Sequence, residues 1–335
     1  MFLKKFFLVV CFMALSSLSF SQGSFSGYMF GDVYFVSEHH NNEVEGQNGF
    51  WFRRIYFTYD YKFSDVFFTR LRLELNSPGD CKTSSNLTPY AKDAYLGMRI
   101  GKSKAYFGMS PTPTLEFIEG FWGYRSVEKT PADLYKVASS RDTGIAFKGD
   151  ISKNLSYHFL LGNGEGTKSE VNEDKRAYLS VLFKKEPFFF EVYTDYGQGD
   201  NETDLKVYQG FLGLKGKKVT YGFQYYKYDK GQGPDKDRVK TDVFSTFLNL
   251  KLSEKSTLLL RVDKMDDPNP FIGKVDYIPF ATTNPFFFYL IGIDFELMKG
   301  VNIIPNIEFV NYEKYNGTKP DNTLIGRITF YYSWK

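Results

Sequence analysis

The sequence contains few cysteines and histidines. Of its two cysteines, Cys11 falls in the N-terminal apolar segment, so Cys81 is the only one in the remainder of the chain. A single cysteine allows no internal disulfide and no multi-cysteine metal site. The three histidines are His39, His40 and His158, and no Ser-His-Asp arrangement can be argued from their spacing. We therefore expect no cofactor, no metal centre and no enzymatic activity.

Long apolar runs are also absent after the N-terminus. A membrane-spanning helix needs roughly 20 consecutive apolar residues. The longest candidate, Pro285–Ile293, runs directly into Asp294, and the mean hydropathy of the chain is −0.35. The sequence thus excludes a helical membrane protein, although it contains 35 Phe and 25 Tyr.

The chain lacks an excess of charge of either sign. It has 42 Lys and Arg against 39 Asp and Glu, and Lys4 and Lys5 belong to the N-terminal segment. A nearly neutral chain is not suited to coating nucleic acid, so we expect no nucleic-acid partner.

Residues 1–21 have the three parts of a secretory signal peptide. Lys4 and Lys5 form a basic start, and Phe6–Leu15 is an apolar run too short to span a bilayer. The small residues Ser19 and Ser21 precede Gln22 at the expected cleavage site. The sequence therefore predicts export, with residues 22–335 as the mature chain.

The stretch 49–75 combines aromatic residues and arginines in an alternating pattern. Period-two alternation predicts β-strands with one apolar and one charged face. In the first strand Trp51 is expected on the apolar face and Arg54 on the opposite face. In the second strand Arg70 and Arg72 lie opposite leucines. A lipid-facing apolar side and a water-facing charged side would explain why aromatic residues and arginines occur in the same strands.

The same alternation predicts sixteen strands and a sorted set of connections. The expected ranges are 25–36, 49–61, 65–75, 91–101, 104–110, 140–150, 153–163, 175–184, 187–197, 204–215, 217–229, 239–252, 255–264, 284–297, 300–312 and 322–334. Connections after even strands are tight turns, whereas those after odd strands are long loops. This sorting is typical of a transmembrane β-barrel, whose closure satisfies every backbone group in lipid. The predicted fold is all-β: a 16-stranded antiparallel transmembrane barrel with short periplasmic turns and long extracellular loops.

Several segments resemble a known family. These are the RLRLE run in the third strand, the stretches GMSPTPTLEF and SRDTGIAFKG on either side of the longest loop, and LLGNGEG at a strand end. On these features the chain resembles Gram-negative outer-membrane porins, and among them the phosphate-selective O/P-type group. The resemblance implies a barrel in the outer membrane that contacts lipid and lipopolysaccharide and assembles as a homotrimer. It implies passive diffusion of small hydrophilic solutes and ions, with the third loop, 111–139, folded inward to constrict the pore.

The predicted constriction pairs a basic wall with the charged third loop. The candidate pore-lining residues are Arg54, Arg70, Arg72 and Arg99 on the strands, and Glu116, Glu119, Arg125, Glu128, Lys129 and Asp133 in the loop. Opposed charges would set a transverse field that orients solutes and sets ion preference. Alternatively, these groups only solvate the lumen and pair with their neighbours.

Two other functions stay open. Arg125, Lys129, Lys136 and Arg141 could hold an anion by several donors, as in an anion- or phosphate-selective porin. The barrel could instead be plugged and serve adhesion or anchoring through its loops.

Overall fold

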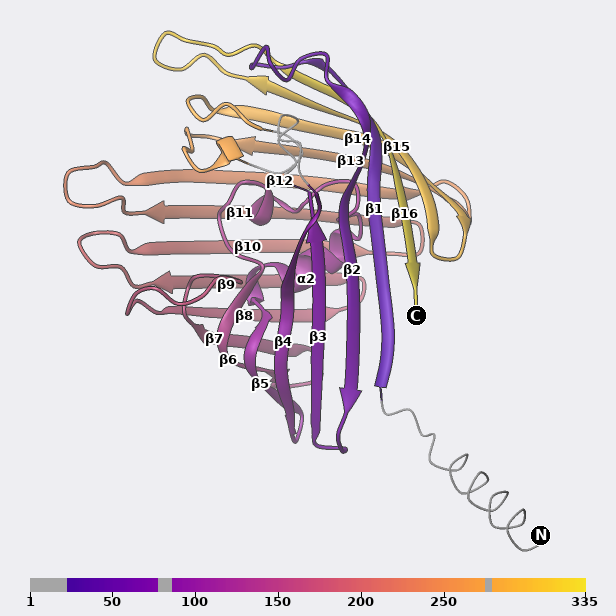
Figure 1. Ribbon diagram of the computed structural model, residues 1–335, viewed down its shortest axis with the longest axis vertical. Helices are drawn as coiled ribbons and strands as arrows, with labels where there is room; N and C mark the ends of the chain where they lie inside the picture. The colour runs from indigo at the N-terminus through magenta and orange to yellow at the C-terminus, as the bar shows by residue number, and fades with distance from the viewer. Residues whose placement is uncertain (1–22, 78–85, 275–278) are drawn as a thin grey trace, which may run out of the picture.

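The chain forms one closed barrel of sixteen antiparallel strands, each paired with its sequence neighbours, and β1 paired with β16 (Figure 1). The computed structural model describes residues 23–77, 86–274 and 279–335, so the predicted signal peptide lies outside the described residues. The prediction of a 16-stranded antiparallel barrel is confirmed.

The strands and helices have the following bounds. The strands are β1 Gly23–Glu38, β2 Asn48–Lys62, β3 Phe67–Asn76, β4 Thr88–Ile100, β5 Ser103–Pro111, β6 Arg141–Asp150, β7 Leu155–Gly162, β8 Arg176–Lys185, β9 Phe188–Gly197, β10 Leu205–Lys215, β11 Val219–Lys230, β12 Val239–Lys251, β13 Ser256–Met265, β14 Phe286–Met298, β15 Val301–Tyr312 and β16 Thr323–Trp334. The helices are α2 Pro113–Trp122, α3 Pro131–Leu134 and the short 3-10 helix η1 Ile272–Lys274. No helix in the described part of the chain is long and apolar enough to cross a membrane.

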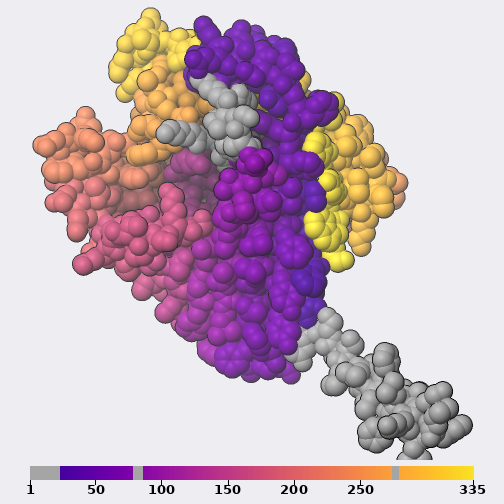
Figure 2. Space-filling model, viewed as in Figure 1, coloured from indigo at the N-terminus to yellow at the C-terminus, as the bar shows by residue number. Residues whose placement is uncertain are grey.

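Large apolar side chains cover the outside of the barrel on every strand. Exposed examples, in strand order, are Phe25, Phe57, Leu71, Leu96, Phe107, Phe147, Leu161, Leu179, Phe190, Leu212, Tyr221, Phe244, Val262, Ile291, Ile307 and Ile328. Figure 2 shows part of this outer wall, where β1 to β5 (indigo to magenta) form a continuous surface. An apolar band that encircles a closed sheet matches the hydrocarbon layer of a bilayer.

The strands β1 and β16 close the barrel along a tightly packed seam. Their register runs from Gly27 opposite Trp334 to Glu38 opposite Leu324. A side chain at Gly27 would collide with the Trp334 ring, so the close approach of these strands requires glycine there.

Two β-bulges change which side chains face the lumen. In β2, Phe30 pairs with Arg54 and Gly31 pairs with Phe52, which leaves Arg53 as the extra residue. A bulge puts two residues opposite one and re-aims the side chains beyond it. The prediction that Trp51 faces outward is therefore wrong, because its indole Nε1 donates to Asp32 Oδ2 at 2.8 Å inside the barrel.

The second bulge lies in β4. Arg72 pairs with Asp93 and Leu73 pairs with Ala91, so Lys92 is the extra residue. The sequence neighbours Arg53 and Arg54 both form ion pairs inside the barrel, and so do Lys92 and Asp93. Without a bulge, strict alternation would point one side chain of each neighbouring couple into lipid.

Candidate functional site: the barrel lumen

The segment between β5 and β6 enters the barrel and is organised around α2. Pro113 occupies the first turn of this helix, where its fixed φ fits and no N–H is required. Gly123 ends the helix in the left-handed conformation, with φ of 78°, and donates its N–H to the Glu119 carbonyl. Figure 1 shows α2 enclosed by the strands.

The helix α2 is amphipathic and thereby divides the lumen. Leu115, Ile118 and Trp122 recur at helical spacing and are buried. Glu116 and Glu119 lie on other positions of the same helix and are partly exposed. One side of the helix is thus suited to an apolar wall and the other to water.

The apolar side packs against aromatic residues of β10 and β12. The Phe121 ring lies 5.2 Å from that of Phe211, and the Trp122 ring lies 5.0 Å from that of Phe247. Aromatic pairs at these separations add attraction beyond burial of their area.

Paired glycines make room for this cluster. Gly213 of β10 and Gly222 of β11 are opposite each other in register. A Cβ at Gly213 would lie 2.6 Å from the Phe121 ring, and one at Gly222 would overlap the Phe247 ring. A larger residue at Gly213 would displace the Phe121 ring of α2, and one at Gly222 would displace the Phe247 ring on which Trp122 packs.

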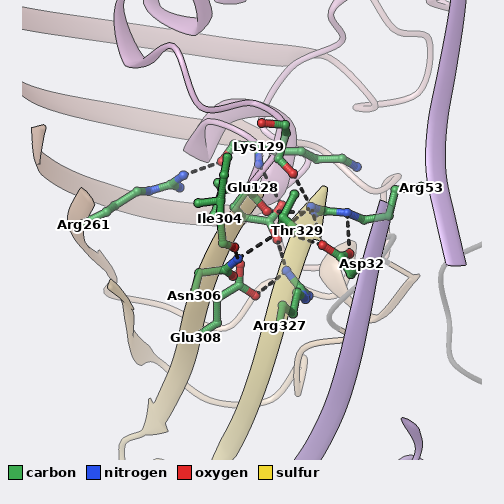
Figure 3. A network of polar contacts seen from close by, with 12 residues as sticks. Asp32, Arg53, Glu128, Lys129, Arg261, Ile304, Asn306, Glu308, Arg327 and Thr329 are labelled. Carbon is green, nitrogen blue, oxygen red and sulfur yellow. Dashed lines mark hydrogen bonds and ion pairs between the residues drawn. The ribbon is translucent and has the colours of Figure 1, made fainter. Parts of the chain in front are cut away.

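Arginines and an asparagine of the wall hold the loop by its backbone, and Figure 3 shows the two arginines, Arg53 and Arg261. The Arg53 guanidinium donates to the carbonyl of Val127 at 2.8 Å and also to that of Ser126. Arg261 donates to the Lys129 carbonyl, and Asn249 donates to the Trp122 carbonyl at 2.9 Å. These donors satisfy carbonyls that a buried loop would otherwise leave unpaired.

A buried ion network surrounds these contacts. Arg327 Nη1 lies 2.7 Å from Glu308 Oε2 and 3.4 Å from Glu128 Oε2. Arg53 Nε lies 2.7 Å from Asp32 Oδ2. All five side chains are at most 3% exposed. Charges so far from water are tolerated because each has a partner of opposite sign.

We call this region the dry half of the lumen: Phe121, Trp122, Phe211, Phe247, Arg53, Arg261, Arg327 and the groups they contact.

The other region contains charges that water reaches, and we call it the solvated half. It comprises Arg72, Lys92 and Arg141 on the wall and Glu119, Arg125 and Asp133 on the loop. Their side chains are between 13% (Arg125 and Arg141) and 31% (Glu119) exposed, although they lie inside the barrel.

On the wall of the solvated half, basic groups alternate with buried carboxylates. Asp93 accepts from Arg141 and lies 3.4 Å from Arg72. Glu74 lies 2.6 Å from the Arg54 guanidinium and 3.1 Å from the Lys92 ammonium.

On the loop side, Arg125 holds two acids. Its guanidinium lies 3.3 Å from Asp133 and 3.8 Å from Glu119. Burial alone would raise the pKa of the Asp133 carboxyl, but the charges of Lys129 and Arg125 outweigh it and hold that pKa below its usual range. Asp133 is therefore ionised at neutral pH.

The ten predicted pore-lining residues occupy three different places. Arg54, Arg72, Glu119, Arg125 and Asp133 come together in or beside the solvated half. Glu128 and Lys129 are buried against the dry half.

The remaining three lie toward the turn end. Arg70 pairs with Asp60 at 2.7 Å, and Arg99 donates to the Asp65 carbonyl at 2.8 Å. Glu116 lies 2.7 Å from the Lys148 ammonium. The four arginines thus do not form one uninterrupted row opposite the loop.

Sequence reasoning missed Arg53 and Lys92 as lumen residues, and it left Glu74 and Asp93, which alternation places on the lumen face, out of the candidate pore-lining set. A usable signal was present, because two adjacent charged residues within a lipid-facing strand can both avoid lipid only through a bulge. In the described ranges no group of three or more His, Cys, Asp or Glu side chains could hold a metal ion.

Comparisons with known proteins show the fold. No family model matches the sequence, and no curated protein does. Among solved structures, the chain is similar to the outer-membrane expressed OmpT of Vibrio cholerae, with 12% identity, a TM-score of 0.67, and coverage of 95% of this chain and 99% of that one.

Two further structures are similar. The anion-selective porin from Comamonas acidovorans gives 11% identity and a TM-score of 0.66, over 93% of this chain and 99% of the porin. Salmonella typhi OmpF in complex with daunomycin gives 8% identity and a TM-score of 0.68, over 93% and 97%. The chain therefore has the barrel fold of outer-membrane porins.

Proposed function

We propose that this protein is an outer-membrane porin through which small hydrophilic solutes and ions diffuse passively. The observation that carries the proposal is the solvated half: six charged side chains inside the barrel that remain 13–31% exposed. Charged groups inside a membrane-spanning structure are costly unless they pair with one another or line a water-filled path, and the partial exposure of these six groups favours the water-filled path. Similarity of fold to porins supports the proposal.

The same proposal covers location and assembly. The apolar outer band would contact outer-membrane lipid, and the long loops would meet lipopolysaccharide after export by the predicted signal peptide. A homotrimer fits the fold, since one similar structure is the trimer form of in-vitro folded OmpT from Vibrio cholerae. We propose no enzymatic activity.

A second candidate is a weakly anion-selective porin. Of the six groups in the solvated half, Arg72, Lys92, Arg125 and Arg141 are basic and only Glu119 and Asp133 are acidic. A surplus of positive charge at a narrow passage favours anions. With the buried Asp93 and Glu74, and with Arg54 paired to Glu74, the surplus falls from two charges to one, so the preference would be weak.

A third candidate, the plugged barrel with a role in adhesion or anchoring, is favoured by the dry half alone. There the loop is sealed against aromatic residues and buried ion pairs. It would require the solvated half to be a closed, water-filled chamber.

The deciding experiment is current measurement on the purified mature protein in a planar bilayer. We expect stepwise ohmic conductance and, across a salt gradient, a reversal potential of small magnitude on the anion side. The matched variant Arg72→Gln should move that potential toward cations without abolishing the steps. A protein that is folded by its heat-resistant mobility but never conducts would refute the porin and leave the plugged barrel.

A further inference from the structure

The turn end of the lumen contains a second chemical environment, separate from the solvated half. A cavity of about 1070 Å³ opens there between the strand ends and α2. Eight basic residues line it: Lys62, Arg70, Arg99, Lys102, Lys104, Lys148, Lys184 and Lys215. Five acidic residues also line it: Asp60, Glu116, Asp150, Glu186 and Glu191. The cavity therefore has a positive surplus.

Three basic side chains of this cavity lie in one row across neighbouring strands, with His158 beside the last of them. Arg99 of β4 pairs in register with Lys104 of β5, Lys104 pairs with Lys148 of β6, and Lys148 pairs with His158 of β7. Side chains directly opposite on one face have Cβ atoms about 5 Å apart, and like charges there destabilise the sheet. A row of this kind is expected where an anion compensates the repulsion.

The protein itself supplies little compensation. Glu116 serves Lys148 and the neighbouring His158, with Oε2 at 2.7 Å from Lys148 Nζ and 3.3 Å from His158 Nδ1. Burial would raise the pKa of the Glu116 carboxyl, but the hydrogen bond from His158 and the charge of Lys148 hold it below the usual range. Glu116 is thus a charged acid that is already fully engaged.

Lys104 has no carboxylate partner among the residues that the structure describes, and neither do Lys102 and Lys215. Arg99 uses an N–H on the Asp65 carbonyl rather than on a carboxylate. Three ammonium groups and one guanidinium therefore face the cavity without a neutralising acid.

Aromatic rings lie directly beside these unneutralised cations. The Phe68 ring lies beneath both the Arg99 guanidinium, at 5.6 Å, and the Lys104 ammonium, at 6.0 Å. Tyr106 meets Phe68 and Tyr95 edge-on, with centroids 6.0 Å and 5.1 Å apart. These rings are only partly buried and all line the cavity. They offer planar apolar surface within reach of the positive row.

We propose that this cavity binds organic anions that carry a planar aromatic ring, such as aryl carboxylates. The anionic group would accept hydrogen bonds from Lys104 and Arg99, and the ring would pack against Phe68, Tyr95 and Tyr106. A bare inorganic anion would leave the aromatic surface unused, and a neutral aromatic would leave the cations unneutralised. The inference rests on the proposed porin function by naming a solute class for it, but binding is measurable without transport.

The test is calorimetric titration of the detergent-solubilised protein with 2-naphthoate. Cyclohexanecarboxylate controls for the charge without the aromatic ring, and inorganic phosphate controls for a generic anion. We expect naphthoate to bind at least about tenfold more tightly than either, the equivalent of about 1.4 kcal/mol.

Three variants locate the site. Lys104→Gln should weaken naphthoate binding about tenfold through loss of a charge-assisted hydrogen bond. Phe68→Leu should weaken naphthoate but leave phosphate unchanged. Lys299→Gln, which removes an exposed lysine at another turn, should change neither. Heat-resistant mobility confirms that each variant is folded.

Each contrary result overturns a distinct part. Equal affinity for naphthoate and phosphate would reject the aromatic specificity, and an unaffected Lys104→Gln variant would reject the site. Absence of conductance together with specific naphthoate binding would reject the porin but keep this inference. Conductance without naphthoate binding would keep the porin but reject this inference.

Discussion

The solvated and dry halves of the lumen both contain arginines, but these arginines meet different partners. In the solvated half Arg72 and Arg141 share Asp93 and keep 18% and 13% of their side chains exposed. In the dry half Arg327 is fully buried between Glu128 and Glu308. The first arrangement leaves charge available to passing ions, whereas the second uses charge to fix the loop.

The difference is imposed by one helix. Because α2 presents Ile118 and Trp122 to one wall and Glu119 to the other, the same loop seals one region and borders water in the other. Stability and selectivity are thereby assigned to separate residues, and substitutions should affect one without the other.

The largest effect is expected from Trp122→Ala in the dry half. The change removes a side chain that is 1% exposed, its packing on Phe247 and its hydrogen bond to the Glu128 carbonyl at 3.0 Å. Loss of a buried tryptophan costs about 3–5 kcal/mol. Denaturant unfolding in detergent measures this loss. Glu119→Ala, on the other side of α2, should cost less than about 1 kcal/mol, and equal losses would erase the distinction between the halves.

The next largest effect is expected from Arg327→Met, which removes the ion-pair partner of the buried carboxylates of Glu128 and Glu308. Breaking a buried ion pair from one side costs about 3–5 kcal/mol. Adding Glu308→Gln should recover part of the loss, because one uncompensated charge disappears. In the solvated half, Arg72→Met should cost only about 1 kcal/mol or less. Thermal unfolding of the wild type, Arg327→Met, the double variant and Arg72→Met measures these losses of stability. A double variant no more stable than Arg327→Met would argue against the ion network.

A selectivity effect should appear in the solvated half with little change in stability. Arg72→Gln combined with Arg141→Gln removes two positive charges from the wall beside Asp93. At about 8 Å in water a unit charge contributes about 0.5 kcal/mol to an ion's energy, or about twofold in permeability per charge. The reversal potential across a salt gradient should move toward cations. The same measurement on Arg261→Gln should show little shift, since that group is 2% exposed.

The smallest effect concerns pH at the loop end of the dry half. His40 stacks on His39 and contacts Tyr312, and burial, with the neighbouring His39, lowers its pKa to about 4. The unfolded chain takes up a proton near pH 6.5 and the folded protein does not, so stability should fall as pH drops from 6.5 to 4. Melting temperatures measured between pH 6.5 and pH 4 test this pH dependence. The fall in melting temperature with pH should be smaller in His40→Gln, and an unchanged fall would assign the pH dependence to other groups.

The fold was predictable because lipid imposes a two-residue period on every strand. The outward positions of Leu71, Phe190 and Ile291 follow from that period and are exposed as expected. Trp51 was misplaced because a bulge resets the period locally, and the alternation beyond it cannot show this.

The site was only partly predictable for a different reason. The charges of Glu119, Arg125 and Asp133 could be recognised as loop charges, but their partners depend on where the loop packs. That position is set by Gly213 and Gly222, whose contribution is empty space rather than a side chain. The pattern of polar and apolar residues in the sequence does not predict where such space lies in the barrel.

The seam between β1 and β16 has a consequence for how the molecule forms. Its partners, Gly27 and Trp334, stand at opposite ends of the sequence, so these contacts have the greatest sequence separation in the sheet. Contacts of this kind form late, since the entropy of closing the chain is lost before the contact is gained. Until then β1 presents an unpaired edge able to recruit a foreign strand. Protection of that edge against foreign strands is therefore needed until β16 has paired with it.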